Sequence, residues 1–123
     1  MNPEEAYLSA LEYGPSNKTR EIACEDPFCA FNYAIYIDKC PRDDTREAAC
    51  KDSIYAYWYT KNIDKESRED TRKAVCRDPE YAYKYAKNID KDFHEDTWLA
   101  IKGTEYEEEY KEFFNNQMKE EII

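Results

Sequence analysis

The chain repeats a sequence pattern every 26 residues, and this period restricts the folds that it can adopt. The segment TREIAC, which begins at Thr19, returns as TREAAC from Thr45 and as TRKAVC from Thr71. A tyrosine and an Ile-Asp-Lys tripeptide follow in the same register in each copy. A fixed period of about 20 to 50 residues is typical of stacked supersecondary units. We therefore expect an all-α fold, a short α-solenoid of stacked helix-turn-helix repeats with about nine helices and no strands.

Each copy encodes a short helix and a longer partner helix, of about 8 and 11 residues. The partner helix opens at Asp26-Pro27 in one copy and at Asp78-Pro79 in another, which places an N-cap residue before a proline at the first helical position. Apolar and polar residues then separate onto opposite faces at about 100° per residue. We predict short helices that begin near residues 19, 45, 71 and 97, and partner helices that begin near 27, 53, 79 and 105.

The same alignment divides one domain, residues 1–123, into five units. Residues 1–14 form a half repeat, 19–44, 45–70 and 71–96 are full repeats, and 97–123 form a capping unit, because atypical terminal units cover the ends of a repeat stack. In the capping unit, Trp98 and Leu99 replace polar residues of the repeat, Ile101 replaces Ala or Val, and Gly103 interrupts the chain. A longer acidic helix should run from there to about Met118. Its expected apolar side consists of Tyr106, Tyr110, Phe113 and Phe114. We expect the stack to be right-handed or nearly straight.

The pattern also assigns individual side chains to the core, the surface and the loops. The tyrosines on the apolar face of each partner helix should be buried in the stack: Tyr33, Tyr59 and Tyr85. The lysines on the opposite face should be exposed: Lys61, Lys84 and Lys87. The recurring arginines, Arg20, Arg46 and Arg72, should pair with acids of a neighbouring repeat such as Asp38, Asp64 and Asp90.

Charge and composition exclude several classes of function. The formal net charge is −10, and residues 104–123 carry −5 of it. Direct binding to nucleic acid is not expected, because phosphate contacts need a basic stripe. No apolar run is long enough to cross a bilayer, and the first residues do not resemble a signal peptide. We expect a cytoplasmic protein, in the host cell if it is viral, that makes no membrane contact.

The cysteines and the single histidine do not form a recognisable catalytic or metal motif. Cys24, Cys50 and Cys76 occupy the same position in successive repeats, where cysteine behaves as a small apolar residue. A zinc site would need ligand spacings that are missing here, so we expect no metal, no cofactor and no disulfide. His94 lies in a charged loop without a triad motif, and two glycines cannot build a phosphate-binding loop. The chain is expected not to be an enzyme.

Aromatic and acidic residues outside the predicted core are the candidates for a binding site. Phe31, Tyr57 and Tyr83 occupy equivalent positions, and either they pack on the adjoining short helix or they form a line of partly exposed rings. Trp58 is the best single candidate, since its counterparts in other copies are polar. The carboxylates of the last helix complete the set, although they could also serve only as a solubilising tail. They are Glu105, Glu107, Glu108, Glu109 and Glu112.

The repeated string Asp-Pro-x-Tyr-Ala-x-x-Tyr-Ala-x-x-Ile-Asp-Lys, followed by acids and Thr-Arg, resembles short tandem helical repeats of uncharacterised tailed-bacteriophage and large-virus proteins. The resemblance covers about residues 19–96 and implies a viral source, but it carries over no functional residues.

We accordingly expect a non-enzymatic protein-binding module, in its sharper form a phage-encoded inhibitor of a host defence or nucleic-acid-processing protein. The partner would be a host protein with a basic surface. The alternatives are a sponge for a small molecule or nucleotide, which should have a pocket with several arginines, and a generic viral scaffold protein. The oligomeric state stays open.

Overall fold

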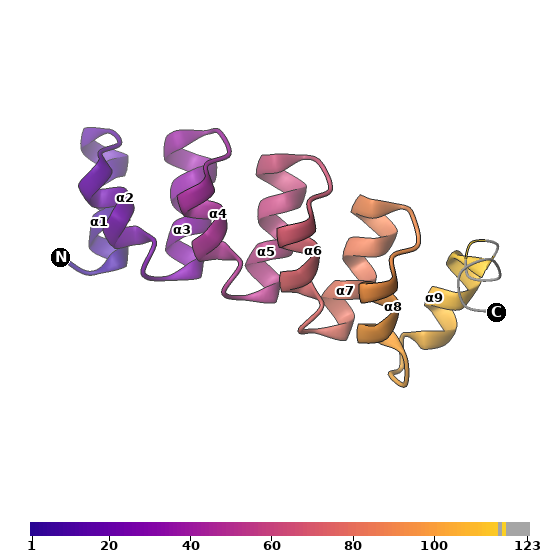
Figure 1. Ribbon diagram of the computed structural model, residues 1–123. Helices are drawn as coiled ribbons and strands as arrows, with labels where there is room; N and C mark the ends of the chain where they lie inside the picture. The colour runs from indigo at the N-terminus through magenta and orange to yellow at the C-terminus, as the bar shows by residue number, and fades with distance from the viewer. Residues whose placement is uncertain (116, 118–123) are drawn as a thin grey trace.

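The computed structural model describes residues 1–115 and 117, and this part of the chain consists of helices joined by short loops, without strands. Figure 1 shows the helix pairs stacked one after another along an elongated molecule, with the N-terminus and the helix of residues 107–113 at opposite ends. The nine α-helices of the described residues are α1 (Pro3–Tyr13), α2 (Asn17–Ala23), α3 (Pro27–Tyr33), α4 (Asp43–Ala49), α5 (Ser53–Tyr59), α6 (Glu69–Val75), α7 (Pro79–Tyr85), α8 (Glu95–Ile101) and α9 (Glu107–Phe113).

This architecture confirms the predicted all-α stack of helical repeats. The partner helices α3, α5 and α7 begin at the predicted residues, where Asp26, Asp52 and Asp78 accept backbone hydrogen bonds as N-caps. The short helices α2, α4, α6 and α8 begin two residues before the predicted starts, and α9 begins two residues after its own. The helix α9 ends at Phe113, and Met118, the predicted end, lies outside the described residues.

Each of the long helices α3, α5 and α7 ends in a π-helical turn, which the sequence analysis missed. The three turns are η1 (Ala34–Asp38), η2 (Thr60–Asp64) and η3 (Ala86–Asp90). A lysine in the left-handed conformation closes each turn, at φ of 56° for Lys39, 57° for Lys65 and 56° for Lys91. Its amide donates to the carbonyl five residues earlier, at 2.8, 2.7 and 2.8 Å. Lysine at these positions does not predict the left-handed conformation, because glycine or asparagine usually adopts it.

The π turns place an aspartate against the recurring arginine. Five residues after Tyr33, a side chain lies about 140° around an α-helix but only about 40° around the wider π turn. Asp38 therefore lies on the side of Tyr33, where Arg20 Nη2 is 2.7 Å from Asp38 Oδ1. The pairs Arg46–Asp64 (2.6 Å) and Arg72–Asp90 (3.0 Å) repeat this contact. The predicted partners are confirmed, but each pair lies within one repeat rather than between neighbours.

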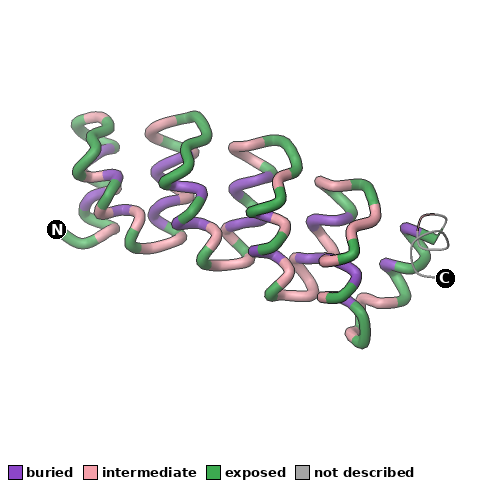
Figure 2. The backbone as a smooth tube through the Cα atoms, in the orientation of Figure 1, coloured by how far each residue is buried: buried purple, intermediate pink, exposed green. Residues whose placement is uncertain are grey.

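A buried tyrosine ties each long helix to the start of the preceding short helix. Tyr59 is fully buried, and its hydroxyl hydrogen-bonds with the Thr45 hydroxyl at 2.8 Å. The same hydroxyl accepts from the Arg42 amide and donates to the Arg42 carbonyl, both at 3.0 Å. Tyr33 and Tyr85 make the equivalent contacts, and their predicted burial is confirmed. Figure 2 shows the buried segments recurring from one helix pair to the next.

The predicted lysine face needs one correction. Lys61 and Lys87 are exposed, as expected. Lys84 is half-buried, because its ammonium group pairs with Glu80 at 3.0 Å and lies 4.8 Å from the centroid of the Tyr81 ring.

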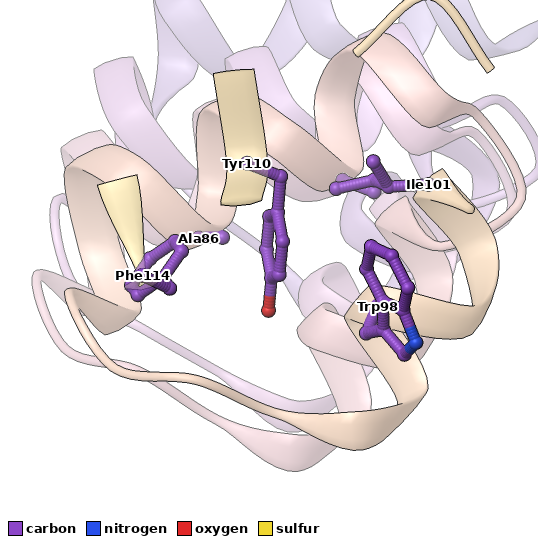
Figure 3. Packing of buried hydrophobic residues seen from close by; sticks show 6 residues of the cluster. Ala86, Trp98, Ile101, Tyr110 and Phe114 are labelled. Atoms are coloured by element: carbon purple, nitrogen blue, oxygen red, sulfur yellow. The ribbon is translucent and has the colours of Figure 1, made fainter. Parts of the chain in front are cut away.

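The last unit closes the stack with a cluster of large side chains (Figure 3). Tyr110 of α9 stacks on Trp98 of α8 with 6.0 Å between ring centroids, and Phe114 lies 4.7 Å from Tyr110. One expectation was wrong here: Phe113 is exposed rather than part of the apolar side of α9, because this short helix buries only one side. Leu99 of α8 is exposed as well, while Trp98, Ile101, Tyr110 and Phe114 are buried in the cluster.

Candidate functional site

The predicted aromatic row lies at the junctions between successive long helices. The Phe31 ring lies 6.0 Å from Tyr55 of the next repeat, the Tyr57 ring 5.7 Å from Tyr81, and the Tyr83 ring 6.0 Å from Tyr106. Phe31 and Tyr83 are half-buried. The row therefore joins the repeats. Each expectation holds in part: Tyr57 packs in one cluster with Val75 of the short helix α6, whereas Phe31 and Tyr83 are partly exposed.

Tyr57 is the most enclosed member of this row. Its side chain is 2% exposed, and its hydroxyl accepts a hydrogen bond from Asn88 Nδ2 at 2.9 Å. A partner could reach the ring only if the junction between α5 and α7 opened. We therefore omit Tyr57 from the candidate surface.

Trp58, in contrast, lies on the outer side of α5. It is 36% exposed, packs edge-on against Tyr57 at 5.3 Å, and has the Lys61 ammonium 5.3 Å from its ring centroid. The equivalent residues are Leu8, Asn32 and Lys84, so the repeat itself does not require an aromatic side chain here. Trp58 has the geometry of a partly exposed anchor residue.

Trp58 belongs to a wider apolar surface across three neighbouring long helices. Six of the ten exposed large apolar residues lie on the outer sides of α1, α3 with η1, and α5. Spacings of three, four or eight residues keep those of one helix on one side, and the 26-residue period puts Phe28 and Ile54 at equivalent positions. We call this surface the long-helix face. It consists of Leu8, Leu11, Phe28, Tyr36, Ile54 and Trp58.

Sequence reasoning found only Trp58, although the same signal marks three other members. Leu8 shares the Trp58 position, and Phe28 and Ile54 share a position that is occupied by Glu4 and Glu80 in the other copies. A comparison of all four copies at each polar position would have found these residues. Tyr36 could not have been found in this way, since its orientation depends on the π turn.

A groove lies in the long-helix face between α1 and α3. Its volume is about 550 Å³, and Tyr7, Leu8, Phe28 and Cys29 contribute its apolar walls. Asn2, Glu4, Asp26 and Asn32 form much of its polar lining. An apolar wall with a polar border suits one large apolar side chain of a partner.

The predicted carboxylates near α9 have more local contacts than the sequence suggested. Glu107 Oε1 accepts a hydrogen bond from the Gly103 amide at 3.1 Å, and its other oxygen lies 3.5 Å from Lys111 Nζ. Glu105, Glu108, Glu109 and Glu112 are exposed. Glu108 and Glu112 lie four residues apart on the same side of α9, where like charges repel each other. Glu105 precedes the helix and does not add to this repulsion. Acids in a first helical turn are also favourable, which gives Glu107, Glu108 and Glu109 a local role.

The described residues offer little reactive chemistry. Burial raises the pKa of the Cys24, Cys50 and Cys76 thiols to about 11, so they are protonated at neutral pH. No group of three His, Cys, Asp or Glu side chains suited to a metal occurs within residues 1–115 and 117. His94 Nε2 lies 3.8 Å from Asp90, and Ser67 donates to the same carboxylate rather than to the imidazole, which is not the order of a catalytic triad.

None of the helices in the described part of the chain has the length and apolar character needed to cross a membrane.

Comparison with known proteins found no protein-family profile, no curated sequence and no solved structure that matches this chain. The geometry above is thus the sole basis for a functional proposal.

Proposed function

We propose that this chain is a non-enzymatic protein-binding module that contacts its partner through the long-helix face. The observation that carries this proposal is the concentration of exposed apolar side chains on α1, α3 and α5. Monomeric soluble proteins rarely expose large contiguous apolar patches, and such patches commonly mark interaction sites. Stacked repeats, moreover, present extended surfaces that suit protein partners.

The stack uses these side chains only in part: Phe28 lies 5.5 Å from Tyr55 and Trp58 lies 5.3 Å from Tyr57, yet Phe28 is 50% and Trp58 36% exposed. The long helices bury their tyrosine, alanine and threonine side chains at other positions, and the residues of the long-helix face are exposed. The equivalent position on α7 carries the charged residues Glu80 and Lys84, and α7 packs into the stack as its neighbours do. Apolar residues at these positions therefore need an explanation outside the fold.

The test begins with recovery of a partner from bacterial lysate by tagged protein, followed by affinity measurements on variants. Phe28→Ala and Trp58→Ala should each weaken binding about tenfold or more, mainly through a faster off-rate. Leu99→Ala is the control, because Leu99 is also an exposed apolar residue, at 62%, but lies on α8. Equal affinity of all three variants, with the fold intact, would contradict the proposal.

A narrower form of the proposal is a phage-encoded inhibitor whose acids occupy the basic, DNA-facing groove of a host protein. Its support is the net charge of −10 and the exposed carboxylates Glu105, Glu108, Glu109 and Glu112. Electrostatic attraction of this kind mainly speeds association and is weakened by salt. Changing these four acids to Gln should then lower the on-rate and its salt dependence. An unchanged on-rate would reject this form and leave the module proposal standing.

The sponge alternative depended on arginines that line a pocket. Arg20, Arg46 and Arg72 instead form largely buried pairs with Asp38, Asp64 and Asp90, and no arginine lines the groove between α1 and α3. We therefore do not pursue that alternative.

A further inference from the structure

Three lysines surround a second cavity beside the long-helix face. Lys61, Lys65 and Lys91 line a space of about 280 Å³ between the C-terminal ends of two long helices. Thr60, Asn88 and Ile89 also line it, together with one carboxylate, that of Glu66. The cavity therefore has an excess of positive charge. We call Lys61, Lys65 and Lys91 the lysine cluster.

The positive charge of the lysine cluster is not neutralised within the described part of the chain. Lys73, Lys84 and Lys111 each pair with a glutamate four residues earlier, at 2.9, 3.0 and 3.5 Å. The three cluster lysines are exposed, and none of them lies within salt-bridge distance of a described carboxylate. The protein as a whole has a net charge of −10, so this local positive charge distinguishes the cavity as a place where a negatively charged group would be attracted.

Backbone conformation adds a second observation at the same place. Lys65 and Lys91 adopt the left-handed conformation, which disfavours side chains other than glycine and asparagine. Lys39 has the same conformation outside the cavity, so the repeated turn accounts for the backbone, and the stacking of η2 beside η3 brings two such lysines to one cavity. A favourable interaction with the helix C-terminus explains part of the preference for lysine, but not the gathering of Lys61 into the same cavity.

The lysine cluster is continuous with the long-helix face. The Lys61 ammonium lies 5.3 Å from the Trp58 ring centroid, and Asn88 on the other side of the cavity donates to Tyr57. Apolar side chains on α1, α3 and α5 thus lead into a basic site between η2 and η3. The surface changes from apolar to positive along the stack.

We propose that the long-helix face and the lysine cluster together bind an acidic amphipathic segment of a partner protein. This inference rests on the proposed function and specifies the partner. Apolar side chains of the segment contact α1, α3 and α5, with one of them in the groove between α1 and α3. Carboxylates of the segment lie at the lysine cluster, where charge complementarity fixes the direction of binding. Nucleic acid fits poorly, because the surface is largely apolar and the protein as a whole repels phosphates.

The length of the surface limits the length of the segment. Neighbouring helices pack about 8–10 Å apart, so the distance from α1 to α7 is about 25–30 Å. An extended segment would cover this distance with about 8–9 residues. A helical one would need about 17–20 residues.

The inference is tested by selecting peptides that bind the full-length protein from a random library of displayed 20-residue peptides. We expect the enriched peptides to combine aromatic or aliphatic residues with Asp and Glu. The simultaneous change Lys61→Glu, Lys65→Glu and Lys91→Glu should weaken their binding about tenfold or more. The matched control is Lys18→Glu, Lys51→Glu and Lys102→Glu, which changes the net charge equally at exposed positions away from the face. Lys→Gln changes at the cluster, with the fold checked by circular dichroism, should give a smaller loss.

The outcomes separate this inference from the proposed function. Peptides that lose binding with Phe28→Ala and Trp58→Ala but not with the cluster variants would support the long-helix face and overturn the acidic segment. Enrichment of basic peptides, or equal losses in the cluster and control variants, would also overturn it. Peptides that tolerate changes to both the face and the cluster would contradict both proposals. The protein could also self-associate through the acids of α9. If it does, and the double variant Glu108→Lys, Glu112→Lys does not, the surface binds a second copy of the chain and the inference is overturned.

Discussion

At the scale of single residues, the tyrosine hydroxyls are the polar contacts that hold each repeat together. Tyr59 is fully buried, yet its hydroxyl finds partners in Thr45 and in the backbone of Arg42. A buried hydroxyl without partners would be costly. The tyrosine-rich composition therefore suits this fold, because the ring fills the core while the hydroxyl fixes the start of a helix.

Changes at Tyr59 should separate these two contributions. Tyr59→Ala should lower the free energy of unfolding by about 3–5 kcal/mol, as expected for a large aromatic truncation. Tyr59→Phe keeps the ring but leaves Thr45 and the Arg42 amide without their partner, and should cost about 1–3 kcal/mol. The control is Tyr36→Phe at an exposed position, which should stay within about 0.5 kcal/mol. Urea denaturation measures all three, and a Tyr59→Ala variant as stable as the parent would refute the assignment.

The repeated cysteines should respond to alkaline pH. Their pKa is raised by burial to about 11 in the folded protein, against about 8.5 in an unfolded chain. The folded state then holds protons more tightly, so this contribution to stability is present below pH 8.5 and is lost as the pH rises towards 11. Denaturation at pH 8 and pH 10 should show the loss, and it should shrink when Cys24, Cys50 and Cys76 are changed to Ala. Exposed Cys40 should be the first thiol to react with iodoacetamide at pH 8.

At the scale of helices, the π turn is the feature that determines which side chains meet. It brings Asp64 to Arg46, and both side chains are nearly excluded from solvent. Removing Asp64 would leave Arg46 with only the fully exposed Asp43 carboxylate, at 2.8 Å, so most of the compensation for its buried charge would be lost. The same turn ends in a left-handed lysine, so one local distortion accounts for both an internal contact and a strained surface position.

Asp64→Asn should therefore lower the free energy of unfolding by about 3–5 kcal/mol. Replacing both members with apolar residues, as in Arg46→Met with Asp64→Leu, should cost much less, because no charge is left buried. Thermal or urea unfolding distinguishes the two variants. Equal losses would mean that the pair acts through packing alone.

The left-handed lysines allow an independent test of the turn. Lys39→Gly should raise the free energy of unfolding by about 0.5–1 kcal/mol, because glycine adopts the observed φ without strain. Glu47→Gly, in the interior of α4, should lower it by about 1 kcal/mol. Destabilisation by both changes would contradict the left-handed assignment of Lys39.

The sequence could predict the elements that depend on local signals. The period, the Asp-Pro caps and the tyrosine spacing gave the helix order and the starts of α3, α5 and α7. The π turns could not be predicted, because no local signal marks them and the ion pair that they allow, Arg20–Asp38, joins residues distant in sequence. For the site, Trp58 was identified from its polar counterparts. Tyr57 was misplaced because helix geometry alone does not show where the next repeat covers a ring.

At the scale of the whole molecule, the junctions between repeats stabilise the stack, and the outer side of the long helices is the surface that we propose for binding. The junctions between repeats hold the aromatic rows, and the capping cluster around Tyr110 closes one end. The outer side of the long helices changes from apolar on α1 and α3 to charged on α7. A partner that follows this change would bind in one direction only.

The central claim is that the partner binds the outer side of the long helices, and hydrogen–deuterium exchange of the complex with a recovered partner tests it most directly. Bound protein should show slower exchange in peptides that cover α1, α3 with η1, and α5, and unchanged exchange in peptides confined to α4 and α6. Slower exchange limited to α9, or to the short helices, would contradict the claim.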